Sequence, residues 1–271
     1  MFYAKMNKGD FMLREFFVNE YPHFIFKPFG LIHNIFTILA FTAAIIIYLN
    51  RNKISKIEKD KTWKVLRISS VILLLNMIIY TFGNLYFGSF NYKEMLPFHL
   101  CFITNYLFMI GSFFKKENIF HITIFLSFLG PIPAILWPDL VSTIDNFNFW
   151  QLVISHHVFM NISLFSYYAL NYHVTFKDFK KTYLIYAILV LISYPLNKMF
   201  DTNYIFTNYI PGNVVELYPF LKPIHPFVIM LIFSFFFFLT IYYIIVYRRN
   251  RELEDEEKSK RTNKRIRSRH K

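Results

Sequence analysis

The 271-residue chain contains a single cysteine, Cys101, so no disulfide can form within it and no Cys-x-x-Cys metal or redox motif is present. A His-Glu-x-x-His motif is also absent, so we expect no metal site and no cofactor. No long stretch is poor enough in apolar residues to form a soluble domain, because 55% of the residues are hydrophobic and 21% are aromatic. These absences indicate an integral membrane protein.

Seven apolar stretches are long enough, or nearly so, to cross about 30 Å of hydrocarbon at about 1.5 Å per residue. They lie near residues 30–49, 65–84, 96–114, 118–137, 150–172, 182–200 and 226–247. Pro131 and Pro133 remove backbone donors near the end of the fourth, so we expect that helix to be kinked or partly unwound. The sequence therefore predicts an all-α fold, a polytopic membrane bundle of seven transmembrane helices.

The basic residues predict how this bundle is oriented. Of the 30 Lys and Arg residues, 23 fall after the first, third and fifth stretches or in the tail from Arg248. Positive charge collects on the cytoplasmic side of membrane proteins, so we expect the N-terminus outside and the C-terminus in the cytoplasm. The predicted parts are an outer N-terminal segment (1–29), the transmembrane domain (30–247) and a charged cytoplasmic tail (248–271), helical at first and then disordered.

The formal net charge of +13 also fits a membrane protein. The basic residues lie in loops and a tail beside membrane segments, so their expected partners are membrane lipids with anionic head groups and not nucleic acid. None of the seven stretches has Asp, Glu or Arg near its middle. This pattern argues against a proton pump, a voltage sensor or an ion pathway built on buried carboxylates.

The polar residues within the membrane stretches and just beyond their outer ends gather instead on the predicted outer side. They are His99, Cys101, Thr104, Asn105, Asp139, His156, His157, Asn161, Asn197, Asn203 and Tyr204. An unpartnered amide or hydroxyl in an apolar setting costs about 1–3 kcal/mol, so these groups must pair with one another or with water. A polar pocket open toward the outer leaflet satisfies them together, and hydrogen bonds between helices are the alternative.

Cys101 is the most reactive side chain of this set. Pro97 suits the first position of a helix, so Cys101 is expected just beyond the first turn, where free N–H groups and the helix dipole favour a thiolate. On a regular helix His99 would face the opposite side, which makes His156 or His157 the better candidate for a base. Three roles stay open for the thiol: a nucleophile in acyl transfer, a ligand of zinc or copper, and a small apolar core residue.

Four sequence blocks carry a family resemblance. They are Leu96-Pro97-Phe98-His99-Leu100-Cys101, Pro133-Ala134-Ile135-Leu136-Trp137-Pro138-Asp139, Ser155-His156, and Asn197 followed by Thr202-Asn203-Tyr204. In this order, over about residues 70 to 245, they resemble the YwaF-like family of integral membrane proteins. That family is similar to a eukaryotic transmembrane acyltransferase that remodels ether phospholipids through a cysteine in the corresponding Leu-Pro…Cys block. The basic tail is not part of the pattern.

The resemblance implies a multi-pass protein of the bacterial plasma membrane that acts as a lipid acyltransferase or transacylase. Cys101 would be the nucleophile and His156 would carry the proton. The residues expected to contact substrate are His99, Asn105, Asp139, Asn161, Asn197, Asn203 and Tyr204, and three of the amides, Asn105, Asn197 and Asn203, are candidates for binding an oxyanion. The alternative hypothesis is a non-catalytic seven-helix transporter or sensor that binds a small ligand in the same pocket.

Overall fold

A computed structural model describes residues 8–18, 24–255 and 258. All regular elements in these ranges are helices, apart from an isolated bridge between Ile25 and Ser142. In chain order they are α1 (Lys8–Val18), α2 (Leu31–Leu49), α3 (Arg51–Ile54), α4 (Lys59–Phe87), α5 (Tyr92–Met95), α6 (Leu100–Phe113), α7 (Glu117–Leu129), α8 (Pro131–Leu136), α9 (Phe147–Leu152), η2 (Val153–Val158), α10 (Phe159–Leu170), α11 (Phe176–Phe200), η3 (Tyr204–Phe206), α12 (Gly212–Leu217), η4 (Pro219–Leu221), α13 (Pro226–Ile241) and η5 (Tyr242–Tyr247). The predicted all-α class is thereby confirmed for the described residues.

Within the described residues, five helices are long and apolar enough to cross a membrane. They are Leu31–Leu49, Lys59–Phe87, Glu117–Leu136, Phe176–Phe200 and Pro226–Asp255. The predicted third stretch forms α6, whose 14 residues extend only about 21 Å, and the predicted fifth stretch forms the consecutive elements α9, η2 and α10. The chain is therefore a multi-pass membrane protein, while the count of seven spans and the orientation stay predictions.

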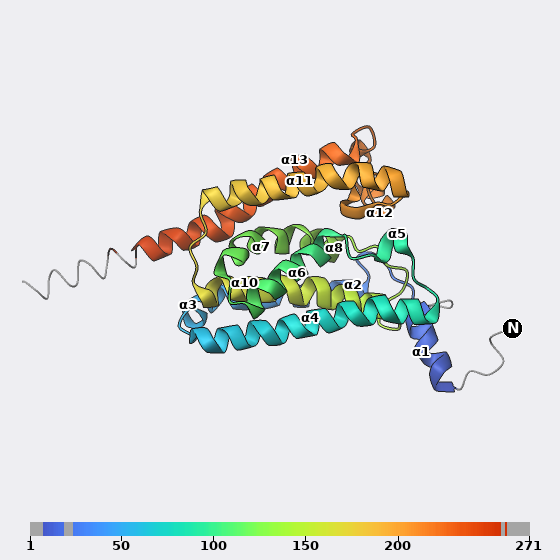
Figure 1. Ribbon diagram of the computed structural model, residues 1–271, viewed down its shortest axis with the longest axis horizontal. Coiled ribbons are helices and arrows are strands. Elements are labelled where there is room, and N and C mark those ends of the chain that lie inside the picture. The colour runs from blue at the N-terminus through green and yellow to red at the C-terminus, as the bar shows by residue number, and fades with distance from the viewer. Residues whose placement is uncertain (1–7, 19–23, 256–257, 259–271) are drawn as a thin grey trace, which may run out of the picture.

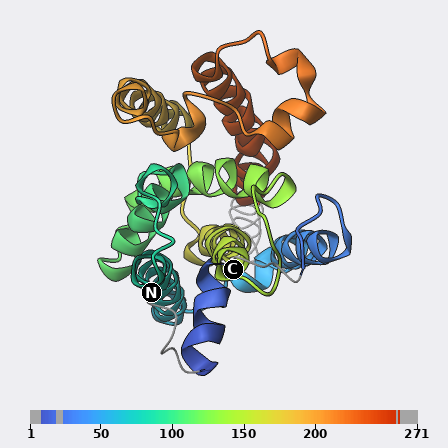
Figure 2. The ribbon, with the colours of Figure 1, turned by 90° about the vertical axis from the view of Figure 1, so that its right-hand side faces the viewer.

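Two helices form a layer of their own. α11 and α13 lie side by side and contact α7, whereas α2, α4, α6 and α10 pack on the other side of α7 and α8 (Figure 1). The end view shows α11 and α13 together on one side of the remaining helices (Figure 2). The largest fully buried side chains include Phe108, Phe120, Phe125, Phe159, Tyr167, Tyr168, Phe179 and Phe238. This aromatic core joins the two layers through α7.

The fourth predicted span is interrupted where its prolines begin. α7 ends at Leu129, and α8 starts two residues later, at Pro131. Gly130 connects the two helices, and its N–H still bonds to the carbonyl of Leu126 at 3.3 Å. Because proline has no N–H to donate, the helix can be interrupted here without leaving a further donor unsatisfied.

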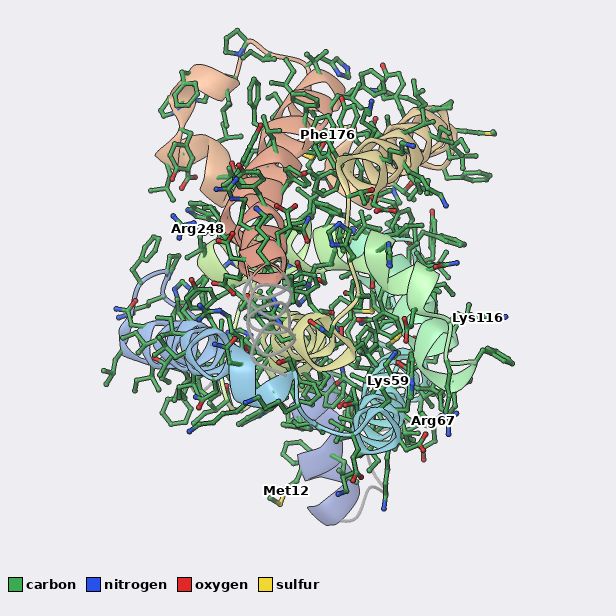
Figure 3. The ribbon with its side chains drawn as sticks, turned by 90° about the vertical axis from the view of Figure 1, so that its left-hand side faces the viewer. Met12, Lys59, Arg67, Lys116, Phe176 and Arg248 are labelled. Atoms are coloured by element: carbon green, nitrogen blue, oxygen red, sulfur yellow. The ribbon has the colours of Figure 1, made fainter. Side chains whose placement is uncertain are left out.

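The basic loops and the start of the tail share one end of the bundle. Figure 3 looks at this end and labels Lys59, Lys116 and Arg248. Arg51 forms two hydrogen bonds to Glu252, at 2.7 and 3.0 Å, so the loop after α2 is tied to the helix that continues α13. The helix runs to Asp255, in agreement with a helical start of the tail; the remainder predicted to be disordered lies outside the described residues, apart from residue 258.

The contact between α1 and α4 depends on a glycine. The Phe17 ring stacks on Phe87 at 5.3 Å and contacts Phe147 at 4.9 Å between ring centroids. A Cβ on Gly83 would lie 2.2 Å from Cε1 of Phe17, so no larger residue fits beneath this ring.

We therefore expect Gly83→Ala to displace Phe17 and to cost about 1–3 kcal/mol of stability, because the added methyl overpacks the contact. Thermal unfolding in lipid nanodiscs measures the loss, and trypsin cleavage after Arg14 should become faster. Gly212→Ala is the matched control, since a Cβ there would meet no atom within 4 Å. Equal unfolding temperatures for the two variants would contradict the prediction.

Candidate functional site

A cavity of about 490 Å³ lies between α6, α8, η2 and α13. Four residues predicted from the sequence line it together: Cys101, His156, His99 and Asp139. The other polar and aromatic side chains of its wall are Tyr80, Glu94, Phe102, Trp137, Gln151, Tyr186, Phe206, Tyr218 and Phe233. Glu94 and Asp139 are exposed, whereas His156 is only 9% exposed. The cavity thus runs from a charged, exposed mouth to a buried interior.

Cys101 occupies the first turn of α6. The helix starts at Leu100 with His99 as its N-cap, three residues later than predicted from Pro97. Its first backbone bond runs from the N–H of Ile103 to the carbonyl of His99, at 3.2 Å. The three preceding N–H groups, those of Leu100, Cys101 and Phe102, have no acceptor within the helix. Free N–H groups at a helix N-terminus favour negative charge beside them, such as that of an oxyanion.

The later start also corrects the position of His99. A regular helix from Pro97 would have placed His99 opposite Cys101, but a capping residue has extended backbone geometry, with ψ of 150°. Both side chains consequently line the same cavity. Gly130 faces Cys101 from the start of α8, and a Cβ there would lie 3.9 Å from the Cβ of Cys101. The small residue leaves room beside the thiol.

His156 lies in η2, a π-helical turn from Val153 to Val158. Its Nδ1 is 3.1 Å from the carbonyl oxygen of Leu152 and 2.9 Å from Oγ of Ser155. A carbonyl oxygen can only accept, so Nδ1 carries the proton in the neutral ring and Nε2 is left as the basic nitrogen. Insertions of this type are frequent at functional sites because they redirect side chains from the regular helical spacing.

His157 and Asn161 lie apart from this cavity. They line a separate, largely apolar groove of about 500 Å³ between α2, α4 and the helix formed by η2 and α10. The amide of Asn161 donates to the carbonyl of Ala40 at 3.1 Å, and so ties α10 to α2. Asn105 is buried in α6 and lines neither space. A contact of Asn105 or Asn161 with substrate therefore stays a prediction that this arrangement does not support.

Asn197 and Asn203 organise a loop beside the cavity. Nδ2 of Asn197 donates to the carbonyl of Tyr204 and to Oγ1 of Thr207, both at 2.7 Å. Oδ1 of Asn203 accepts from the backbone N–H groups of Asn208 and Tyr209, at 3.0 and 3.1 Å. Neither amide lines the cavity, and Tyr204 borders it through its ring contact with His99, 4.9 Å between centroids. Their role as substrate contacts stays untested.

Sequence reasoning missed several residues of the cavity wall. Tyr80 and Tyr186 carry no signal, because aromatic residues are common throughout the chain. Trp137 lies within a quoted block, Glu94 lies two residues before another, and Gln151 is an amide at the start of a membrane stretch, so these three had a usable signal in the sequence. Among the described residues no three His, Cys, Asp or Glu side chains meet in a way that could hold a metal ion.

The fold and the site define a multi-pass helical membrane protein with an internal cavity around its only thiol. The model of the TMEM164 family matches residues 25–247. The chain therefore belongs to the TMEM164 family, while the YwaF-like assignment and the relation to an acyltransferase stay predictions. Searches of curated proteins and of solved structures found no match.

An ion pair closes the loop region near the mouth of the cavity. Lys93 of α5 bonds to Asp201, the residue that ends α11, and both lie outside the membrane-spanning segments. This hydrogen bond and the accompanying charge attraction lower the pKa of Asp201 and raise the pKa of Lys93. The carboxylate therefore stabilises the fold above its unfolded pKa of about 3.9, and this contribution is lost as pH falls through the lower folded pKa. The ammonium contributes below about pH 10.4, and its contribution is lost as pH rises through the raised folded pKa.

We expect Asp201→Asn to lower the unfolding temperature slightly between about pH 4 and pH 10 at low salt, because both groups are exposed. Unfolding curves at pH 2 and pH 6, each with and without 1 M salt, test this window. The difference from wild type should vanish at pH 2 and shrink in salt. The double variant with Lys93→Gln should be no less stable than Asp201→Asn alone; a further additive loss would show that the two groups do not act as a pair.

Proposed function

We propose that this protein is a lipid acyltransferase or transacylase that works through a thioester on Cys101. The observation that carries the proposal is the position of the chain's only thiol at the open N-terminus of α6, in a cavity shared with His156. A nucleophile, a base and backbone N–H donors are the components that acyl transfer requires. Membership of the TMEM164 family fits a lipid-facing role but names no reaction.

In the first half-reaction the Cys101 sulfur attacks the carbonyl carbon of an acyl ester, and His156 Nε2 takes the thiol proton. The oxyanion is stabilised by the free N–H groups of Cys101 and Phe102. The C–O bond of the ester then breaks, and His156 returns the proton to the leaving alkoxide. In the second half-reaction the hydroxyl of another lipid attacks the thioester, gives its proton to His156, and releases the thiolate, which takes that proton back.

The cavity wall supports an amphiphilic substrate. Tyr186, Met230 and Phe233, on the α11 and α13 side, form an apolar wall suited to an acyl chain. Glu94 and Asp139 lie at the exposed mouth, where a head group would remain in water. We place this mouth on the outer side of a bacterial plasma membrane, with seven spans, an outer N-terminus and the basic end against anionic lipids of the cytoplasmic leaflet.

The direct test is acyl labelling of the full-length protein in lipid nanodiscs with a fluorescent acyl phospholipid. Wild type should form a hydroxylamine-sensitive adduct on Cys101, and Cys101→Ser should form none. His156→Ala should form the adduct about 10²–10⁴-fold more slowly, the usual contribution of a general base. His157→Ala is the matched control and should react like wild type, because His157 lies in the separate groove.

Labelling that persists in Cys101→Ser would overturn the thioester mechanism. If wild type forms no adduct, and Cys101→Ala retains ligand-dependent activity, the cavity is the binding site of a transporter or sensor.

Ser155 should act as a positioning residue for His156, because its hydroxyl shares the Nδ1 proton with the carbonyl of Leu152. We expect Ser155→Ala to slow adduct formation about fivefold, the rate equivalent of about 1 kcal/mol, and Ser155→Thr to restore most of it. Nitrogen NMR of labelled histidine would show a mixture of ring tautomers in Ser155→Ala. A single tautomer and an unchanged rate would show that Leu152 alone orients the ring.

A further inference from the structure

A strained turn forms part of the cavity wall. Ile205 and Phe206 have φ angles of +59° and +57°, in the left-handed region. Side chains rarely adopt this region, and for a β-branched residue such as isoleucine it is a genuine outlier. Neither residue is a glycine or an asparagine, so the local sequence does not favour this conformation. Such strain persists only where the surrounding structure holds it in place.

Hydrogen bonds from α11 hold the turn. The Asn197 amide, only 1% exposed, donates to the carbonyl of Tyr204 and to the Thr207 hydroxyl, and accepts from the N–H of Tyr204 at 2.9 Å. Ser193 donates to the same carbonyl at 2.7 Å. Tyr204 and Thr207 directly flank the two strained residues. One buried side chain therefore binds the backbone before the strained residues and the Thr207 side chain after them.

The turn lies at the thiol end of the cavity. Ile205 is 5% exposed, and both strained residues line the cavity wall. The rings of Tyr204 and Phe206 lie 4.9 and 5.5 Å from the ring of His99, between centroids. His99 caps the helix in which Cys101 is the second residue. Two aromatic rings of the turn thus lie against the residue that caps the helix of Cys101, and Ile205, between them in the chain, lines the same cavity as the thiol.

Without the backbone strain, the turn would not place the same side chains in the cavity wall. If residue 205 returned to a negative φ, its backbone would rotate and its side chain would leave its present direction. The strain therefore has a use at this position, because it directs an isoleucine into the cavity, where neither a glycine nor an asparagine would fill the same space. Strained backbone of this kind concentrates at binding and active sites.

We propose that Ile205 is a specificity-determining residue that limits the width of the group able to reach Cys101, and that Asn197 is the positioning residue that holds it there. The consequence for the substrate rests on the proposed function: the turn would admit an unbranched acyl ester and exclude one that is bulky next to the carbonyl. The steric limit itself applies to any reagent that attacks the thiol.

Alkylation of the single thiol by reagents of graded width tests the proposal without any enzymatic activity. The full-length protein in lipid nanodiscs is treated with iodoacetamide and, separately, with a maleimide that carries a diphenylmethyl group. The quantity measured is the rate constant for the bulky maleimide divided by the rate constant for iodoacetamide. Ile205→Ala should raise this ratio about tenfold, the usual effect of missing methylenes in a tight apolar site. An unchanged ratio would overturn the proposal.

Two variants that remove hydrogen bonds between Asn197 and the turn extend the test. Asn197→Ala should raise the ratio because the turn relaxes, and Thr207→Val should do so more weakly, because it removes one acceptor while keeping the side-chain shape. If Asn197→Ala does not fold, Thr207→Val still decides whether the hydrogen bonds of Asn197 hold Ile205 in position. Ile124→Ala is the matched control: Ile124 is 1% exposed in the same core but does not line the cavity, so its ratio should stay at the wild-type value. An equal rise in the control would mean general loosening and would overturn the proposal.

The two proposals fail separately. A raised ratio in Ile205→Ala without any acyl adduct in wild type would support the steric wall and reject the acyltransferase. An acyl adduct in wild type, with equal ratios in wild type and Ile205→Ala, would reject the wall alone.

Discussion

A peptide group that departs from helical geometry inside a bilayer must find another partner, because hydrocarbon offers none. Four irregular features of the backbone border the cavity, in the apolar helices and in the loop after α11. α6 starts late, α7 and α8 meet at Gly130, η2 is π-helical, and the turn at Ile205 and Phe206 is left-handed. All four lie in the cavity wall, where the protein itself supplies partners such as Asn197. A second π-helical segment, η5, lies elsewhere, toward the basic end.

The polar residues that the sequence predicted for the site divide into two groups by how their hydrogen-bonding capacity is used. The amides of Asn161, Asn197 and Asn203 bond to backbone groups and hold helices or loops in place. Cys101 and the second ring nitrogen of His156 are left for chemistry. The division follows from the free-energy cost of an unpaired buried polar group. An amide has four hydrogen-bonding positions to satisfy, so it is better suited to holding structural elements together than to serving as a reactive centre. The presence of a polar residue at membrane depth does not by itself show whether it holds the structure together or is available for chemistry.

The sequence was sufficient to predict the all-α membrane class, because long apolar stretches indicate membrane helices. Four of the predicted pocket residues, Cys101, His99, Asp139 and His156, line one cavity, although the regular helix expected from Pro97 would have turned His99 away from Cys101. The sequence could not predict the start of α6, since Pro97 suits a first helical position and only the surrounding fold makes Leu100 the actual start. Strain at Ile205 was equally invisible, because tertiary hydrogen bonds impose it against the local preference. The arrangement that brings residues of α8, α11 and α13 into one cavity wall depends on packing that periodicity does not encode.

The bidentate pair between Arg51 and Glu252 joins residues that are 201 positions apart. Arg51 follows α2, and Glu252 follows α13, so the contact joins the two ends of the helical region from α2 to α13. A ribosome makes Glu252 201 residues after Arg51, so the first helices enter the membrane before this partner exists. The cavity wall also needs Met230 and Phe233 of α13, so the cavity is assembled only after α6, α8 and η2 have waited for the later helix.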